Sequence, residues 1–132
     1  MPASSYPWIV LAALAGASGV GCGAYAAHGL GFIASPEARE AARLSLQSAT
    51  QYQLLHALAL LGVGLWAAMR PGGRWLLAAG LLFLAGILLF SGLIYLQTFT
   101  GFAGLRRFVP WGGMSFILGW LALGAAAVRT VP

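Results

Sequence analysis

The sequence predicts an all-α integral membrane protein folded as a four-helix transmembrane bundle. Hydrophobic residues make up 61% of its 132 residues and charged residues only 7%, against about 25% charged residues in an ordinary soluble domain. Four long apolar stretches each have about the 20 residues that a helix needs to cross the hydrocarbon core of a bilayer. So few charges cannot coat a water-soluble globule, which excludes soluble enzyme folds and disordered chains. We expect one transmembrane domain over residues 1–132, with spans at about 7–27, 51–69, 75–96 and 111–128.

The first stretch, 7–27, carries no charged residue and is too long for the core of a cleaved signal peptide. Small residues recur along it at every fourth position, from Ala15 to Ala27. Such a row lets the backbone of a second helix approach closely, either inside the bundle or between two copies of the chain. The glycines expected at helix-packing positions are Gly19, Gly23, Gly112, Gly113 and Gly119.

The second span is expected to begin well before the membrane. Ser35 suits a helix N-cap, Pro36 suits the first helical position, and Glu37 favours the positive end of the helix. No glycine or proline follows until Gly62, so one helix is predicted from Pro36 to Met69. At about 1.5 Å per residue this helix is longer than the bilayer core, which is about 30 Å thick. Its first turns therefore form an interfacial N-terminal extension.

The later connections differ in character. The Arg-Pro-Gly-Gly-Arg run at 70–74 predicts a tight turn, which makes the second and third spans antiparallel neighbours. The segment 98–110 has three phenylalanines beside Arg106 and Arg107, and we expect it at headgroup level. Three arginines then lie on one side of the membrane and four on the other. This balance does not decide the orientation by the positive-inside rule.

Polar side chains of the spans are expected to gather in one leaflet. Antiparallel threading brings the ends of the first and third spans to the same depth as the starts of the second and fourth. Polar residues inside a membrane usually face the bundle interior and mark function, but they also tie helices together, and both interpretations stay open. The candidate binding residues are His28, Gln53, His56, Ser91, Tyr95 and Trp111.

His56 is the one ordinarily titratable side chain well inside a span. It lies about 14 residues, or roughly 21 Å, from Arg70 along the second helix. A neutral imidazole offers one hydrogen-bond donor and one acceptor. Leaving either of them unpaired in lipid costs about a few kcal/mol, as for other buried polar groups. We therefore expect hydrogen bonds from Gln53, Ser91, Tyr95 or a backbone carbonyl.

Several kinds of chemistry are disfavoured by what the spans contain. No span carries an acidic residue, which a carboxylate-driven proton or cation transporter would need. Cys22 and His28 lie about 240° apart around a helix, so they do not form the start of a zinc site. Ser91 and His56 lack an acid to orient a hydrolytic dyad. We expect no metal, no cofactor and no enzymatic activity.

Four motifs, in order along most of the chain, resemble the domain of unknown function 423 family, which is also described as similar to transmembrane protein 256. The resemblance implies a small four-helix protein of the inner membrane, bacterial or organellar, with no assigned biochemical role. In one departure, Leu93 stands where the family usually has a second serine after Phe-Ser-Gly. The motifs are GAYAAHGL (23–30), YQLLHALALL (52–61), FSGLIY (90–95) and PWGGMSFILGW (110–120).

The sequence therefore favours a non-enzymatic protein of the bacterial inner membrane. We expect the one-leaflet polar cluster to bind a lipid, an amphipathic small molecule or a partner's helix. A small oligomeric transporter or channel and an accessory subunit of a membrane complex remain alternatives, so a homo-oligomer or a partner membrane protein stays open. The arginines stand singly or in pairs beside apolar runs, which suits phospholipid headgroups and argues against nucleic acid as a partner.

Overall fold

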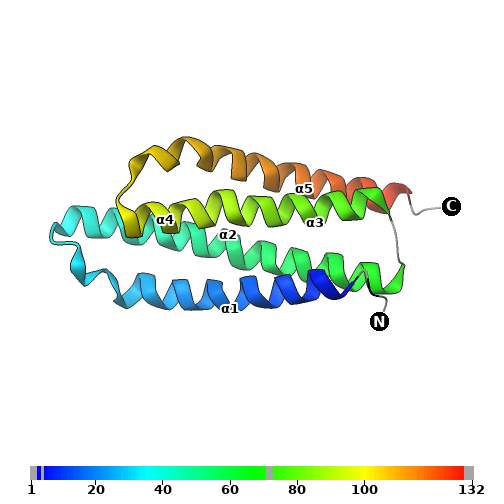
Figure 1. Cartoon of the computed structure of the whole chain (residues 1–132), viewed down its shortest axis with the longest axis horizontal. Coiled ribbons are helices and arrows are strands. Elements are labelled where there is room, and N and C mark those ends of the chain that lie inside the picture. The colour runs from blue at the N-terminus through cyan, green and yellow to red at the C-terminus, as the bar shows by residue number, and fades with distance from the viewer. Residues whose placement is uncertain (1–2, 4, 71–72, 130–132) are drawn as a thin grey trace.

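The computed structural model describes residues 3, 5–70 and 73–129, and it confirms the predicted all-α fold (Figure 1). No strand occurs in the described residues. Four helical stretches within them are long and apolar enough to cross a membrane: Tyr6–His28, Pro36–Met69, Arg74–Thr100 and Ala103–Arg129. The elements in chain order are α1 (Tyr6–His28), η1 (Leu30–Phe32), α2 (Pro36–Met69), α3 (Arg74–Gly86), η2 (Ile87–Gly92), α4 (Leu93–Thr100), η3 (Ala103–Phe108) and α5 (Val109–Arg129).

The second helix, α2, runs unbroken from Pro36 to Met69, as predicted. Ser35 caps it, because its hydroxyl oxygen accepts a hydrogen bond from the backbone N–H of Ala38 at 3.3 Å. The start of α2 protrudes past the end of α1, at the end of the bundle drawn on the left of Figure 1. This protruding part is the predicted N-terminal extension.

The relative heights of α1 and α2 follow from their contacts. A Cβ added to Gly23 would lie 3.1 Å from the Thr50 side chain, so these two residues face each other. Continuing this antiparallel pairing by five residues brings His28, the last residue of α1, level with Ser45. Residues 36–44 therefore extend beyond the first helix.

The third span is one helical rod built from three segments. It is α-helical to Gly86, π-helical over Ile87–Gly92 and α-helical again to Thr100. A π-turn adds one residue to a helical turn and so rotates the residues that follow it. The tight turn predicted before this rod falls on residues 71 and 72, which lie outside the described residues.

A left-handed glycine ends the rod. Gly101 has φ 71°, and its N–H donates to the Gln97 carbonyl at 2.8 Å, which closes the last turn of α4. The short 3₁₀ helix η3 then leads directly into α5. The connection between the third and fourth spans is therefore largely helical, where the sequence alone indicated only an interfacial segment.

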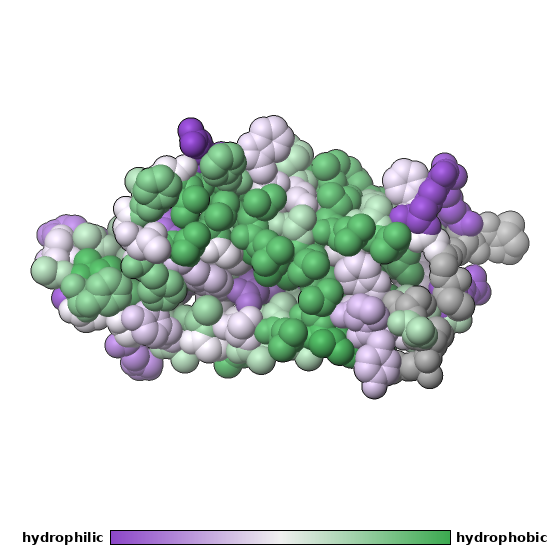
Figure 2. Space-filling model, in the orientation of Figure 1, coloured by the Kyte–Doolittle hydropathy of each residue, from purple (hydrophilic) through white to green (hydrophobic). Residues whose placement is uncertain are grey.

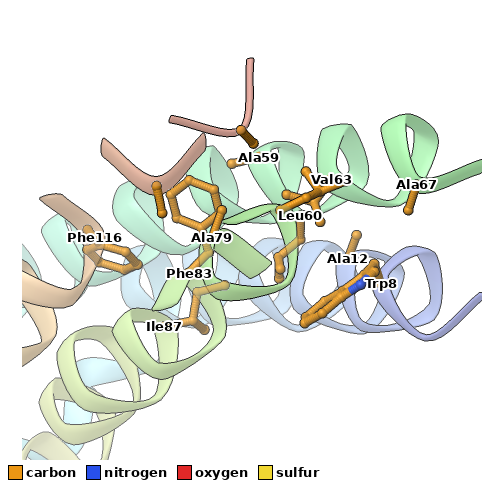
Figure 3. Packing of buried hydrophobic residues seen from close by; sticks show 13 residues of the cluster. Trp8, Ala12, Ala59, Leu60, Val63, Ala67, Ala79, Phe83, Ile87 and Phe116 are labelled. Atoms are coloured by element: carbon orange, nitrogen blue, oxygen red, sulfur yellow. The ribbon is translucent and has the colours of Figure 1, made fainter. Parts of the chain in front are cut away.

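The core lies where α1, α2 and α3 meet, with α5 closing it from the side of α3. Figure 3 shows Trp8 from α1, Leu60 from α2 and Phe83 from α3 pointing into this shared space. Leu60 and Phe83 are completely buried. Phe116 of α5 packs against the same cluster. A second, smaller cluster forms near the end of α1, from Ala26, Leu30 and Leu46.

Glycines allow the closest approaches between helices. A Cβ added to Gly112 would lie 2.8 Å from the Cα of Phe90 and closer still to the Phe90 backbone nitrogen. The start of α5 therefore lies directly on the backbone of the π-helical segment. At three other predicted packing glycines an added carbon would meet side chains: Leu54 at Gly19, Thr50 at Gly23 and Phe83 at Gly119.

Gly113 departs from the expectation that it packs against another helix. A Cβ added there would meet no heavy atom of the described residues within 4 Å. Gly113 follows Gly112 by one residue, which turns it by about 100° around α5 and away from η2. Gly113 therefore has no packing partner among the described residues.

Candidate functional site

Side chains from three helices form a hydrogen-bonded chain in the bundle interior, which we name the Gln53 network. The Gln53 amide nitrogen donates to the Ala15 carbonyl at 2.9 Å and to the Ser18 hydroxyl at 2.8 Å. The Gln53 amide oxygen accepts from the Tyr95 hydroxyl at 2.7 Å. The Thr50 hydroxyl lies 3.3 Å from the same Tyr95 oxygen. The buried amide therefore has partners for both hydrogens and for its oxygen, and it joins α1, α2 and α4.

Two buried serines join further helix pairs in the same way. The Ser91 hydroxyl, in η2, donates to the Ala49 carbonyl of α2 at 2.7 Å. The Ser115 hydroxyl, in α5, donates to the Leu82 carbonyl of α3 at 2.7 Å. Each serine thus donates its hydroxyl hydrogen bond to a neighbouring helix and has no further hydrogen to donate to a ligand.

His56 forms a separate contact between α2 and α5, which we name the His56 clamp. Its Nδ1 lies 2.7 Å from the Tyr52 carbonyl, and its Nε2 lies 3.1 Å from Nε1 of Trp120. An indole N–H can only donate, so Nε2 accepts and the ring carries its proton on Nδ1. The ring also stacks on Phe116, with the centroids 3.6 Å apart. The expected backbone carbonyl partner is present, whereas Gln53, Ser91 and Tyr95 bond elsewhere.

The predicted cluster is therefore divided in the structure. Gln53 and Tyr95 are directly bonded, and Ser91 anchors the same rod to α2. His56 faces α5 instead and shares no hydrogen bond with the Gln53 network. The two remaining candidates lie at the surface: His28 ends α1 in an exposed position and Trp111 is 67% exposed.

Ser18, Thr50 and Trp120 are polar partners that the sequence alone did not single out. Thr50 precedes Gln53 by three residues and so shares its helix face, which is a usable signal. Ser18 donates to the Leu14 carbonyl of its own helix while accepting from Gln53. Trp120 lies in the fourth motif, but its contact with His56 depends on how α5 is rotated against α2.

A groove opens at the end of the bundle where α2 protrudes, and we name it the end groove. It has a volume of about 670 Å³ and lies between α2, α4 and the η3–α5 connection. Its walls are mostly alanine and larger apolar side chains, and its polar residues are two serines, a glutamine, a threonine and an arginine. Its lining residues are Ile33, Ala38, Ala41, Ala42, Leu44, Ser45, Ser48, Ile94, Gln97, Thr98, Arg106 and Val109.

The end groove crosses the level at which α1 ends. Ser45 lies level with the last residue of α1, so the groove residues before it belong to the extension and Ser48 lies toward the bundle. Figure 2 shows hydrophobic side chains across the middle of the visible face and most hydrophilic ones toward the two ends. The groove therefore joins the polar end of the molecule to its hydrophobic band.

The glutamates at this end already have partners. Glu40 pairs with Arg43, and that hydrogen bond lowers the pKa of Glu40 and raises the pKa of Arg43. The pKa of Glu37 is lowered by a hydrogen bond from its own backbone N–H and then by the Ser35 hydroxyl, which donates to it at 2.9 Å. Both carboxylates are therefore occupied within the start of α2.

The polar side chains of the end groove are mostly without partners. Arg106 makes no ion pair with either glutamate, and both glutamates are among the described residues. Ser45, Ser48 and Gln97 donate no side-chain hydrogen bond to another described residue, whereas Thr98 bonds to the Ile94 carbonyl at 2.9 Å. The interior side chains of Gln53, Ser91 and His56 thus have hydrogen-bond partners. The buried Trp75 Nε1 has none among the described residues, and it does not line the groove, where the other free donors lie.

No group of three or more His, Cys, Asp or Glu side chains among the described residues is arranged to hold a metal ion. The free donors of the end groove are hydroxyl, amide and guanidinium groups, which bind anionic or hydrogen-bond-accepting oxygens. This arrangement can therefore bind a ligand that presents such oxygens.

Comparison with known proteins identifies relatives over nearly the whole chain. The family described as "Protein of unknown function (DUF423)" matches residues 22–113. The UPF0382 membrane protein YwdK of Bacillus subtilis is 36% identical over 92% of this chain and 96% of its own length. A UPF0382 membrane protein of Staphylococcus aureus is 39% identical, over 92% of this chain and 95% of that protein. One from Haemophilus influenzae is 36% identical, over 93% and 94%. No solved structure matches.

Proposed function

Because this chain belongs to the DUF423 family of bacterial membrane proteins, whose names state no activity, we propose its function from its own geometry: it binds a bilayer phospholipid in the end groove. In this proposal the protein is a non-enzymatic component of the inner membrane. The proposed site lies at the end of the bundle that holds the first and third connections. The residues that form the site differ from those expected.

The observation that carries the proposal is the contrast between satisfied and free polar groups. Gln53, Ser91 and His56 have their hydrogen bonds inside the bundle and are at most 4% exposed. A ligand could reach them only by breaking contacts that hold helices together. The end groove instead offers free donors next to apolar walls, and its volume is in the range of small-molecule sites, about 300–1,000 Å³.

A phospholipid fits this arrangement because it is polar at one end and apolar at the other. Leu44, Ile94 and Val109 supply apolar walls for acyl chains. Ser45, Gln97 and Arg106 supply donors for the oxygens of the glycerol and phosphate groups. In this proposal the level at which α1 ends, which the groove crosses, is where headgroup and acyl chain meet.

The test is to fill the groove with a large side chain. We expect the purified protein, after delipidation in detergent and addition of a phosphatidylglycerol and phosphatidylcholine mixture, to retain lipid in native mass spectra. Ser48→Trp, inside the groove, should lose most of the retained lipid. Leu55→Trp, on an exposed part of α2 that does not line the groove, is the matched control and should retain it. Absence of lipid from the unmodified protein, or equal retention by both variants, would overturn the proposal.

A further inference from the structure

We infer that the end groove selects phospholipids with a net negative headgroup, and that Arg106 recognises the charge. This inference rests on the proposed function, because it names the class of lipid that the groove takes. It also assigns a role to a connection that the sequence analysis treated only as an interfacial segment.

The end of the molecule that holds the groove carries more positive than negative charge. Four arginines and two glutamates lie there: Arg39, Arg43, Arg106, Arg107, Glu37 and Glu40. Both glutamates have partners near the start of α2, as described above. Arg39 donates from Nε and a terminal nitrogen to the Ile33 carbonyl, at 3.0 and 2.7 Å. Three arginines, Arg39, Arg106 and Arg107, therefore have no anionic partner among the described residues, and of these only Arg106 lines the end groove.

The neighbouring residues Arg106 and Arg107 differ in their position relative to the groove. Arg106 lines the end groove beside Gln97 and Thr98 of α4. Arg107 does not line it, and its guanidinium lies 5.0 Å from the ring centroid of Phe108. Only Arg106 can therefore act on a headgroup held in the groove, whereas Arg107 can attract anionic lipid only from the general surface.

The donors of the groove match an anionic headgroup. None of the residues that line the groove is acidic. A guanidinium presents a planar set of five N–H donors that suits the oxygens of a phosphate. Phosphatidylglycerol adds only hydroxyl groups to its phosphate, whereas phosphatidylcholine adds a cation next to an end that already has excess positive charge. The groove should therefore favour the anionic lipid.

The experiment compares Arg106→Gln with Arg107→Gln, which remove the same charge one residue apart. Each protein is delipidated and mixed with equal amounts of phosphatidylglycerol and phosphatidylcholine of the same acyl chains, and retained lipid is counted by native mass spectrometry. Circular dichroism and gel filtration establish that the variants fold. We expect the unmodified protein to retain the anionic lipid with about fivefold preference, in line with one arginine at an anionic headgroup. Arg106→Gln should bring the ratio close to one, and Arg107→Gln should leave it nearly unchanged.

The outcomes distinguish this inference from the proposed function. Retention of both lipids in equal amounts by the unmodified protein would overturn the selectivity and leave lipid binding in place. An equal loss of preference in both arginine variants would also overturn it, because general surface attraction would then explain the effect. If the unmodified protein retains neither of the two lipids, the proposed function itself is overturned.

Discussion

Both polar atoms of the His56 side chain make their hydrogen bonds inside the bundle. Its two ring nitrogens bond to Tyr52 and Trp120, and its ring stacks on Phe116. It is 2% exposed and lines no part of the end groove. These contacts assign it to the joint between α2 and α5.

Replacing His56 tests this assignment. His56→Leu should insert and fold, with a loss of about 1–2 kcal/mol in the free energy of unfolding, because the Trp120 N–H loses its acceptor. The double variant His56→Leu/Trp120→Phe removes that unpaired donor, so it should recover part of the loss. The measurement is reversible unfolding in mixed micelles. Lipid retention that collapses while the fold survives would show instead that His56 binds the ligand.

The Gln53 network makes a second prediction at the same scale. Gln53→Leu removes both hydrogen bonds to α1 and the acceptor of the Tyr95 hydroxyl, so we expect a loss of about 1–3 kcal/mol. Gln51→Leu is the matched control, because Gln51 lies two residues away, is exposed and makes no side-chain hydrogen bond to a described residue. It should change the free energy of unfolding little. Equal effects of the two changes would contradict a special role for the network.

The π-helical segment η2 is the distinctive element of the bundle. It carries Ser91, which bonds to α2, and its backbone at Phe90 lies against Gly112 of α5. The rod therefore contacts two neighbours at the same height, one by a hydrogen bond and one by backbone packing. Such a contact leaves no room for a side chain on the α5 side.

Alanine substitutions at adjacent glycines test this packing. Gly112→Ala places a Cβ against the Phe90 backbone, which cannot move aside as a flexible side chain could. We expect a loss of about 1–3 kcal/mol in the free energy of unfolding. Gly113→Ala meets open space and should be neutral or slightly stabilising, because alanine favours the helix. Thermal unfolding of the two variants under the same detergent conditions gives the comparison, and similar midpoints would contradict the packing described.

At the scale of the whole molecule, the end groove results from unequal helix lengths. The extension of α2 continues past the end of α1, and α4 continues to Thr100. The chain then turns back through η3, so α5 begins only at Val109. The extension of α2 and the end of α4 therefore lack a full set of neighbouring helices, and the space between them remains open.

Cysteine accessibility tests the arrangement of the whole chain across the membrane. Cys22 is the only cysteine and lies within α1, so a membrane-impermeant maleimide should not label the unmodified protein in sealed vesicles. In a Cys22→Ala background, Ala3→Cys and Ser35→Cys place thiols at exposed positions before and after α1. They should be labelled from opposite sides of the membrane. Labelling of both from the same side would contradict a membrane-spanning first helix.

Much of the fold could be predicted because its signals lie within single segments. Apolar length predicted the helices, and Ser35, Pro36 and the absence of breakers predicted the uninterrupted α2. The candidate site was less accessible to such reasoning. Gln53 and Tyr95 were expected in one cluster and do bond, but His56 joins Trp120 on another side of the bundle. Residues at the same depth meet only if each helix is rotated about its axis so that their side chains face one another.

The sequence by itself therefore determined the membrane class, the helical fold and the extension of α2. Hydropathy, capping and helix propensity act along a continuous stretch of chain, so no partner is needed to read them. Only the tertiary structure decided which polar groups are satisfied, where Gly112 meets a backbone and where an open groove remains. Those features depend on the rotation of each helix about its axis and on the π-turn in η2, and packing between distant segments sets both.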